Sequence, residues 1–208
     1  MSTPIRAGIL GGTFDPIHIG HVETASAVRR MLSLNYVMLL PSRTPPHRNI
    51  EPRASGYHRF AMTALAAGER EDLRASDIEL RRDGPSYTVH TLESLHDDGF
   101  AAAQLYFIVG ADAFAEIDTW YDYPRLLELA NFVVVPRPGF PAPAAPPQQH
   151  RGPTTVSCLD ISTPDVSSTD IRQRVAKGEP IADLVTRGVA EHIRRHQLYV
   201  PVPAAARL

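Results

Sequence analysis

The sequence predicts an α/β fold in which helices cover both faces of a doubly wound, mainly parallel sheet. Short apolar runs alternate along the chain with longer amphipathic stretches, which is the order that strand–helix–strand units produce. The chain has 208 residues, of which 43% are hydrophobic, so it can bury one substantial core. We therefore expect a single domain over residues 1–208.

Apolar runs of four to six residues are the candidate strands, since this length is typical of strands in such sheets. The predicted strands are Ile5–Leu10, Tyr36–Leu40, Asp77–Leu80, Leu105–Val109, Phe132–Val135 and Thr155–Leu159. Amphipathic stretches between and after them predict helices over Gly20–Leu32, Tyr57–Ala67, Thr88–His96, Tyr123–Ala130, Thr169–Lys177 and Val189–His196.

A proline-rich segment interrupts this alternation after the fifth predicted strand. Six prolines stand between Pro136 and Pro147, and so many prolines exclude regular structure there. We expect an exposed surface loop over about residues 136–153, inserted within the domain and not a domain boundary. The tail 201–208 is expected to be flexible.

Composition excludes several classes of protein. The net charge of −2 and the pI near 6.5 give no overall basic field, so we expect no nucleic-acid partner. The longest apolar runs are far below the ~20 residues that cross a bilayer, and the N-terminus lacks a secretory pattern, so we expect a cytoplasmic protein without a membrane partner. The single cysteine, Cys158, excludes an internal disulfide and is expected to be a small core-facing residue. The sequence leaves the oligomeric state open.

A local excess of basic side chains lies between Pro41 and Arg59, where Glu51 is the only acid. Such an excess suits a phosphate ligand, and a solvated surface loop is the alternative. We prefer the solvated loop for Arg53 and Arg59. The basic residues are Arg43, His47, Arg48, Arg53, His58 and Arg59.

The most informative segment, residues 11–21, lies between the first predicted strand and the first predicted helix. Ligands of open parallel sheets bind outside the carboxyl ends of the strands. Gly11 and Gly12 lack a Cβ, so the backbone there can turn tightly and bring its N–H groups close to a phosphate. His18 and His21 are three residues apart, which places both imidazoles on one face at the anion-attracting start of the helix.

The same segment could instead belong to another class of nucleotide-binding protein or to a metal site. It lacks the Gly-Lys-Ser/Thr ending of a P-loop and the glycine spacing of the dinucleotide fingerprint, which argues against a P-loop kinase or a nicotinamide-dependent dehydrogenase. Zinc would need ligands beyond the two histidines, and no third histidine or cysteine has suitable spacing nearby, so no metal-binding residue is predicted. Either histidine alone could be structural, but the pair after two glycines favours a function.

A second candidate phosphate site opens the helix predicted near the C-terminus, in the segment Ser167–Arg172. Serines at a helix start usually cap its free N–H groups, and we expect this of one of the two serines. Arg172 lies one turn into the helix, where its guanidinium can share an anion with the hydroxyls and the exposed N–H groups.

Together the two segments resemble the signature of the nucleotidylyltransferase superfamily. The segments that carry the resemblance are Gly12–Pro16, His18–His21 and Ser167–Arg172. Within the superfamily the chain resembles the bacterial nicotinate-nucleotide adenylyltransferases from about Ile5 to Tyr199, through the landmarks Pro41–Arg48, Pro85–Thr88, Gly110–Ala113, Thr119–Tyr121 and Arg137–Gly139. The resemblance implies a Rossmann-like fold.

The resemblance also implies roles for individual residues. Residues expected at the ATP phosphates are His18, His21, Ser168, Thr169 and Arg172, of which His18, His21 and Arg172 would be catalytic; Gly11, Gly12, Thr13 and Phe14 form the ATP-binding turn. Gly110 and Asp112 are implied for adenosine, although Asp112 could equally be a solvated helix-start residue. The pyridine site implies Trp120 as a stacking platform, or else core packing, with Thr88 and the backbone N–H of Tyr121 at the carboxylate. Weaker assignments place Arg137 at the acceptor phosphate, and His47 and Arg48 on a basic lip.

The expected reaction is transfer of AMP from ATP, with Mg²⁺, to nicotinate mononucleotide, which gives deamido-NAD and pyrophosphate. The alternatives are an adenylyltransferase for nicotinamide mononucleotide or phosphopantetheine, and a non-catalytic nucleotide-binding module. Physical argument does not decide between the acid and the amide pyridine, whereas the resemblance favours the acid.

Overall fold

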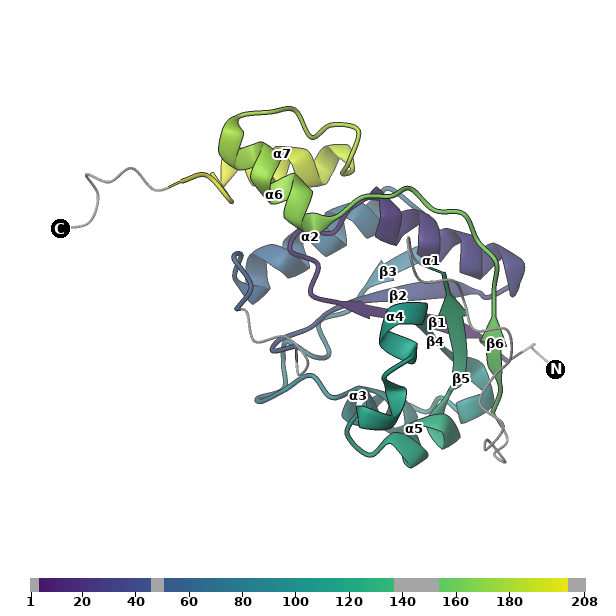
Figure 1. The fold of residues 1–208 in the computed structure, drawn as a ribbon. Helices are drawn as coiled ribbons and strands as arrows, with labels where there is room; N and C mark the ends of the chain where they lie inside the picture. The colour runs from purple at the N-terminus through teal and green to yellow at the C-terminus, as the bar shows by residue number, and fades with distance from the viewer. Residues whose placement is uncertain (1–3, 46–50, 137–153, 202–208) are drawn as a thin grey trace.

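A computed structural model describes residues 4–45, 51–136 and 154–201 (Figure 1). Its centre is a sheet of six parallel strands in the order β3-β2-β1-β4-β5-β6. The strands are β1 Ala7–Gly12, β2 Tyr36–Pro41, β3 Leu73–Ala75, β4 Leu105–Gly110, β5 Asn131–Val135 and β6 Val156–Cys158. The predicted doubly wound sheet is therefore confirmed.

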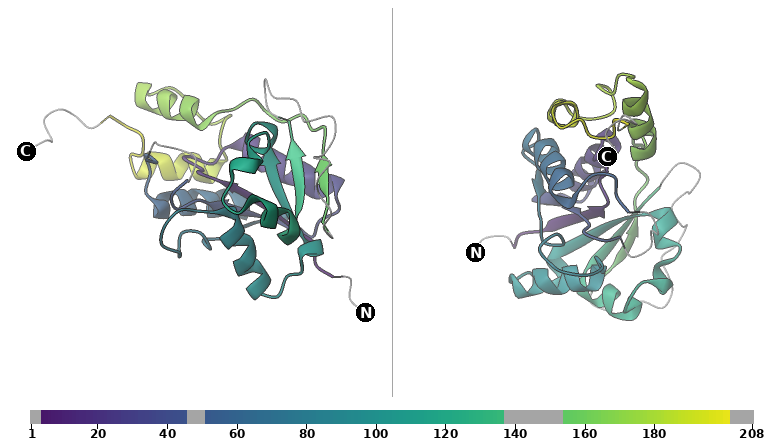
Figure 2. Two further views of the ribbon diagram at one scale, coloured as in Figure 1. Left: turned by 60° about the horizontal axis from the view of Figure 1, so that its bottom comes forward. Right: turned by 90° about the vertical axis from the view of Figure 1, so that its left-hand side faces the viewer.

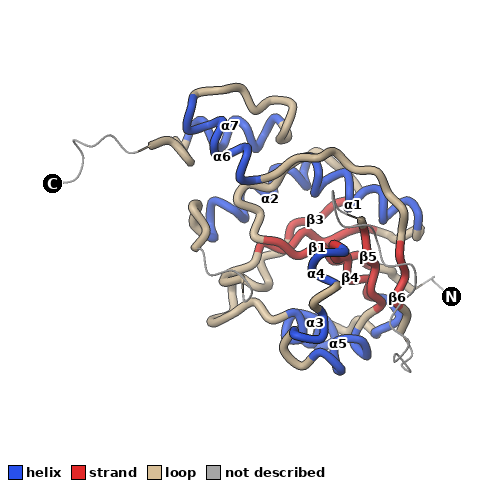
Figure 3. Tube along the Cα trace, in the orientation of Figure 1, coloured by secondary structure: helices blue, strands red, loops and turns tan. Residues whose placement is uncertain are grey.

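Helices connect the strands and flank the sheet, as the tube in Figure 3 shows. The α-helices are α1 Ile19–Met31, α2 Gly56–Gly68, α3 Thr88–Asp97, α4 Ala111–Phe114, α5 Tyr123–Leu129, α6 Ser168–Lys177 and α7 Arg187–Arg195. Two 3₁₀ turns, η1 Ala102–Gln104 and η2 Ile117–Thr119, complete the described part. All six predicted helices are found within a few residues of their expected bounds, whereas α4 was not predicted. In the part of the chain that the structure describes, no helix has the length and apolar character to cross a membrane.

Each face of the sheet has its own hydrophobic core. On one face Val22 of α1 and Met62 of α2 pack with side chains of α6 and α7, and on the other Leu92 of α3 packs with Leu126 of α5. The two helical layers lie on opposite sides of the sheet in both views of Figure 2. Neighbouring residues of one strand contribute their side chains to opposite cores, because strand side chains alternate between the two faces of the sheet. In β1, for example, Ile9 and Leu10 belong to different cores.

The predicted strand Asp77–Leu80 is wrong. The third strand is the shorter segment Leu73–Ala75, which pairs with β2 at the edge of the sheet, and residues 77–80 form a turn. The amides of Leu80 and Arg81 both donate to the carbonyl oxygen of Asp77, which closes that turn. A three-residue edge strand leaves too little apolar pattern for a period of two to be recognised.

The order of the strands fixes where a ligand can bind. The chain winds from β1 out to β3 on one side and then returns to β4, which lies next to β1. The connections after β1 and β4 therefore diverge, and a crevice forms beyond the carboxyl ends of these two strands. The glycines that end both strands, Gly12 and Gly110, lie at this crevice.

Candidate active site

A cleft of about 290 Å³ opens at this crevice. Its lining includes the predicted ATP-binding turn Gly11–Phe14 together with His21, Gly110 and Ser168. Asp112, at the start of α4, also lines it. The sequence motifs at the two ends of the chain therefore meet at one cleft.

The histidine pair is stacked at the start of α1. The two ring centroids are 3.7 Å apart, and the backbone N–H of His18 donates to Nδ1 of His21 at 3.3 Å. Because Nδ1 accepts this hydrogen bond, the neutral ring of His21 carries its proton on Nε2, the ring atom that can donate. His21 lines the cleft, whereas His18 is 7% exposed and lies behind it. The two histidines are paired as expected, but only the ring of His21 lines the cleft.

Phe14 explains why the ATP-binding turn contains glycine. Its ring is buried and meets the ring of His21 edge-on, with centroids 4.9 Å apart. A Cβ on Gly12 would lie 2.7 Å from the Phe14 ring, closer than side chains tolerate, whereas a Cβ on Gly11 would meet no atom within 4 Å. Gly12 thus allows Phe14 to pack, and Gly11 keeps the cleft open.

The N-terminus of α6 is joined directly to the first turn. Oγ of Ser168 donates to the carbonyl oxygen of Pro16 at 2.9 Å, and the guanidinium of Arg172 donates to the carbonyl oxygen of Asp15 at 2.7 Å. Arg172 also donates to Oγ1 of Thr169. Ser167 caps the helix by accepting from the N–H of Asp170, which is the capping role expected of one serine. Ser168 lines the cleft, whereas Thr169 and Arg172 are not among its lining residues and reach it only through the hydrogen bonds to Asp15 and to each other.

Asp15 connects this junction to the C-terminal segment. Its buried carboxylate accepts hydrogen bonds from the amides of Arg53 and Ala54 and from the hydroxyl of Tyr199. Burial raises the pKa of the Tyr199 phenol, and the negative charge of Asp15 raises it further, so the phenol remains a donor. Asp15 lies within the first motif, but the sequence does not mark it as a site residue, because its partners come from distant segments.

Arg59 corrects an expectation. The sequence placed it in a solvated loop, but its side chain is 2% exposed and donates to backbone carbonyl oxygens around the first turn. Arg53, in contrast, is exposed, as expected. A signal for Arg59 was present: the buried side of α2 consists of residues 59, 62, 63, 66 and 67, the spacing of one helix face. A charged residue on that face was read as solvent-facing because its partners come from other segments.

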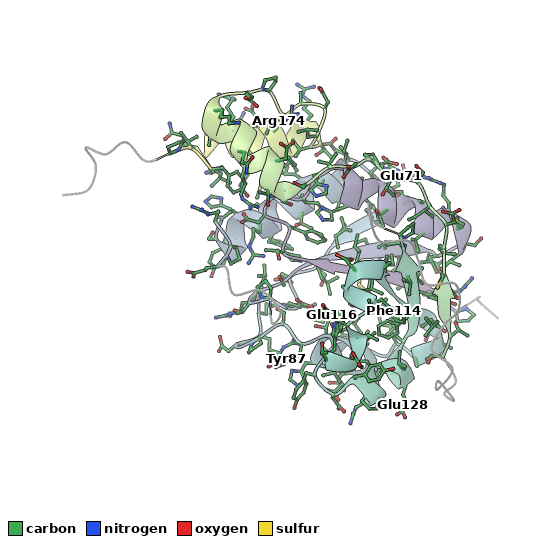
Figure 4. All side chains as sticks on the ribbon, viewed as in Figure 1. Glu71, Tyr87, Phe114, Glu116, Glu128 and Arg174 are labelled. Carbon is green, nitrogen blue, oxygen red and sulfur yellow. The ribbon has the colours of Figure 1, made fainter. Side chains whose placement is uncertain are left out.

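The far end of the cleft is aromatic. Thr88, Trp120 and Tyr121, the predicted pyridine-site residues, all line it. The ring of Trp120 packs edge-on against Phe107, and the exposed ring of Tyr121 stacks on Tyr87 with centroids 4.5 Å apart. Figure 4 shows how far this end lies from α6: the labelled Tyr87 is near α3, and the labelled Arg174 is on α6, on the opposite side of the sheet. Tyr87 was not named as a site residue, although it lies in the Pro85–Thr88 landmark.

A buried acid supports this end of the cleft. Glu79 is 7% exposed, accepts from Oγ1 of Thr91 at 2.9 Å and is hydrogen-bonded to Ser86. Burial raises the pKa of Glu79, and the bonds to Thr91 and Ser86 and the charge of Arg82 oppose that rise. Glu79 and Ser86 both line the cleft. Glu79 was missed because it belongs to the segment that we assigned to a strand.

Three predicted site residues, His47, Arg48 and Arg137, lie outside the described residues. Cys158 is half-buried at the end of β6 and packs against the second core, where burial raises the pKa of its thiol. Within residues 4–45, 51–136 and 154–201, no group of three acidic, histidine or cysteine side chains is arranged to hold a metal ion.

Comparison with known proteins agrees with this geometry. A family model described as Cytidylyltransferase-like matches residues 9–174. The fold and the cleft therefore define a protein of the Cytidylyltransferase-like class. In fold, the chain is similar to Plasmodium falciparum nicotinic acid mononucleotide adenylyltransferase complexed with NaAD, with a TM-score of 0.70, 17% identity, and coverage of 94% of this chain and 98% of the other.

Curated relatives narrow the class. A probable nicotinate-nucleotide adenylyltransferase of Roseiflexus sp. (strain RS-1) is 44% identical over 95% of this chain and 98% of the relative. A second protein of that name, from Shewanella baltica (strain OS185), is 37% identical over 95% of this chain and 100% of the relative. The chain belongs to the nicotinate-nucleotide adenylyltransferase family.

Proposed function

We propose that the protein transfers the adenylyl group of ATP to the phosphate of nicotinate mononucleotide, which yields nicotinate adenine dinucleotide (deamido-NAD) and pyrophosphate for NAD biosynthesis. The observation that carries this proposal is the junction of two distant segments at one cleft. The hydroxyl of Ser168 donates a hydrogen bond to the carbonyl oxygen of Pro16, which is 152 residues away. The cleft that Ser168 lines continues to the aromatic pair Trp120 and Tyr121. One end suits a triphosphate and the other a planar ring.

The chemistry is a direct displacement. A phosphate oxygen of the acceptor forms a bond to the α-phosphorus of ATP, the bond from that phosphorus to the bridging oxygen breaks, and pyrophosphate leaves with the electron pair. Negative charge grows on the leaving group and the α-phosphate oxygens. A fixed donor such as Nε2 of His21 stabilises this charge more in the transition state than in the ground state. His18 orients His21 by stacking on it and by donating its backbone N–H.

We propose MgATP as the form of the nucleotide that reacts. Mg²⁺ is usually bound by one or two carboxylates and by substrate phosphates, not by a cage of protein ligands. The cleft leaves room for an ion carried in by the nucleotide, because the turn 11–14 lines a cavity of about 290 Å³. When bound, the ion would neutralise charge on the triphosphate.

The acceptor is assigned to the aromatic end. We propose that the nicotinate ring stacks on Trp120 and that Thr88, the first residue of α3, and the backbone N–H of Tyr121 bind its carboxylate. The start of α3 favours an anion. Gly110 and Asp112 would bind adenosine. Arg137 remains a proposed contact to the acceptor phosphate, and His47 and Arg48 remain a proposed basic lip at the substrate site.

The acceptor assay tests this proposal. The purified protein is incubated with ATP, Mg²⁺ and one of three acceptors: nicotinate mononucleotide, nicotinamide mononucleotide or phosphopantetheine. We expect pyrophosphate release to be fastest with the nicotinate compound, because a site built for a carboxylate leaves buried donors unpaired with the amide, at a cost of roughly 1–3 kcal/mol. Faster release with another acceptor would reassign the substrate, and no release with any acceptor would leave a nucleotide-binding module.

A further inference from the structure

Arg59 makes an unusual set of contacts for a residue outside the sequence motifs. Its guanidinium donates to the carbonyl oxygens of Ser42 at 2.6 Å, Thr13 at 2.8 Å, Ala54 at 3.2 Å and Arg43 at 3.4 Å. A buried arginine normally pairs with a carboxylate, whereas the acceptors of these four hydrogen bonds, among the residues that the structure describes, are all main-chain oxygens. These contacts therefore fix backbone positions directly.

The acceptors come from three different segments. Thr13 belongs to the ATP-binding turn after β1, Ser42 and Arg43 follow β2, and Ala54 precedes α2. Thr13 and Ser42 both line the cleft, and the amide of Ser42 also donates to the carbonyl oxygen of Gly12 at 2.8 Å. One buried side chain thus sets how the β2 segment lies against the ATP-binding turn.

The same contacts continue to the acceptor end of the cleft. The amide of Arg43 donates to Oγ of Ser86 at 2.9 Å, and Ser86 is hydrogen-bonded to the buried carboxyl of Glu79. Ser86 is followed by Tyr87 and by Thr88, which begins α3 and lines the cleft. Hydrogen bonds, linked by short stretches of backbone at Arg43 and at residues 86–88, therefore join the ATP-binding turn to the segment proposed to bind the pyridine carboxylate.

Arg59 contributes by fixing the positions of these backbone segments and not by its positive charge. Asp15 is close enough to interact with the guanidinium electrostatically and offsets part of its positive charge at the phosphate end. The planar fork of arginine can reach several acceptors at fixed angles, which the single ammonium of lysine cannot do. Loss of the side chain would leave buried carbonyl oxygens without donors and allow the segments to shift.

We propose that Arg59 is a positioning residue for adenylyl transfer, which holds the ATP-binding turn and the acceptor-binding segment at the separation that in-line attack needs. This inference rests on the proposed function. A displacement of about 1 Å between reacting groups can cost on the order of 10²-fold in rate. Loss of Arg59 should therefore change the kinetic constants for both substrates and not those for ATP alone.

Arg59→Met, Arg59→Lys and a control variant, Met62→Ala, test the proposal. Met62 is fully buried one turn further along α2 and does not line the cleft, so its truncation destabilises the same helix without touching the site. For each variant we would measure the Tm, the Kd of a non-hydrolysable ATP analogue, and kcat and the KM of both substrates, well below the Tm. The analogue Kd does not depend on turnover.

We expect Arg59→Met to lower kcat/KM for both substrates by about 10²-fold and to weaken binding of the analogue. Arg59→Lys should give values between those of Arg59→Met and the wild type. Met62→Ala should keep wild-type KM values despite its lower Tm. If Arg59→Met does not fold, Arg59→Lys carries the test. A folded Arg59 variant whose kinetic constants and analogue Kd match those of Met62→Ala would overturn the proposal. A wild-type protein that binds the analogue but forms no dinucleotide would refute the proposed function instead, and the analogue Kd would still report on Arg59.

Discussion

At the scale of single residues, substitution of His21 should affect catalysis much more than it affects the stability of the fold. We predict that His21→Ala lowers kcat by about 10²–10³-fold, because it removes a fixed donor to the charge that develops in the transition state. The Tm should fall only modestly, since the ring is not part of either core and its main contribution to stability is to accept the His18 N–H at the start of α1. Steady-state kinetics and thermal unfolding measure the two effects. His196→Ala, at a histidine that does not line the cleft, is the control for kcat, and an unchanged kcat in folded His21→Ala would contradict the assigned role.

The adjacent glycines of the ATP-binding turn should respond differently to the same substitution. Gly12→Ala places a Cβ 2.7 Å from the buried ring of Phe14, so we predict a lower Tm, with a loss of about 1–3 kcal/mol from overpacking. Gly11→Ala places its Cβ in open space that belongs to the cleft, so we predict a near-normal Tm but a higher KM for ATP. Thermal unfolding and kinetics of both variants check this. Equal Tm losses would show that the turn differs from the one described.

The sequence indicates polar residues at a glycine-rich turn better than it indicates buried charges. His21 and Ser168 follow from helix-start chemistry, because donors near a helix N-terminus suit an anion whatever packs around them. Arg59 and Glu79 could not be placed in this way, since the burial of each depends on partners from distant segments. The sequence shows only their polarity, which predicts solvent exposure.

At the scale of elements, α7 is attached to α2 partly through histidines. Nδ1 of His58 lies 3.1 Å from Nε2 of His192, and the ring of His196 stands 4.4 Å from that of His192. Burial lowers the pKa of His192 from its ordinary value of 6.5, and electrostatic interaction with the imidazoles of His196 and His58 lowers it further. The unfolded chain therefore binds a proton at a pH at which the folded chain does not.

This difference predicts a pH-dependent stability. Because the unfolded state binds more protons below pH 6.5, stability should be complete above that pH and fall as the pH drops toward the lower folded pKa of His192. We predict that His192→Gln reduces this loss. Thermal unfolding between about pH 7.5 and 5 measures the effect, and His90→Gln on α3 serves as the control. Identical pH profiles for wild type and His192→Gln would show that His192 does not govern the loss.

The predicted elements were most accurate where packing and local pattern agree. The strands β1, β2, β4 and β5 are buried almost throughout and read as apolar runs. The edge strand Leu73–Ala75 pairs on one side only and includes the exposed Arg74, so its position depends on β2 and not on its own sequence. The apolar residues Ile78 and Leu80 on either side of Glu79 gave the pattern of a short strand, whereas the structure forms a turn there.

At the scale of the whole molecule, the doubly wound topology produces the site. Residues 11–21 and 167–172 are remote in sequence, and the reversal of strand order between β1 and β4 opens the crevice at which they meet. The resemblance of both motifs to one family was enough to predict that they share a ligand. It was not enough to predict that Asp15 and Tyr199 close the junction, because that contact depends on how the C-terminal segment returns to the first turn.

The central claim is that this cleft holds one triphosphate so that its α-phosphorus is attacked. The most direct measurement follows two labels, with ATP labelled at the α-phosphate in one reaction and at the γ-phosphate in another, each with nicotinate mononucleotide and Mg²⁺. Adenylyl transfer predicts that the α label appears in the dinucleotide and the γ label in pyrophosphate. Release of ADP, with the γ label on the acceptor, would contradict it.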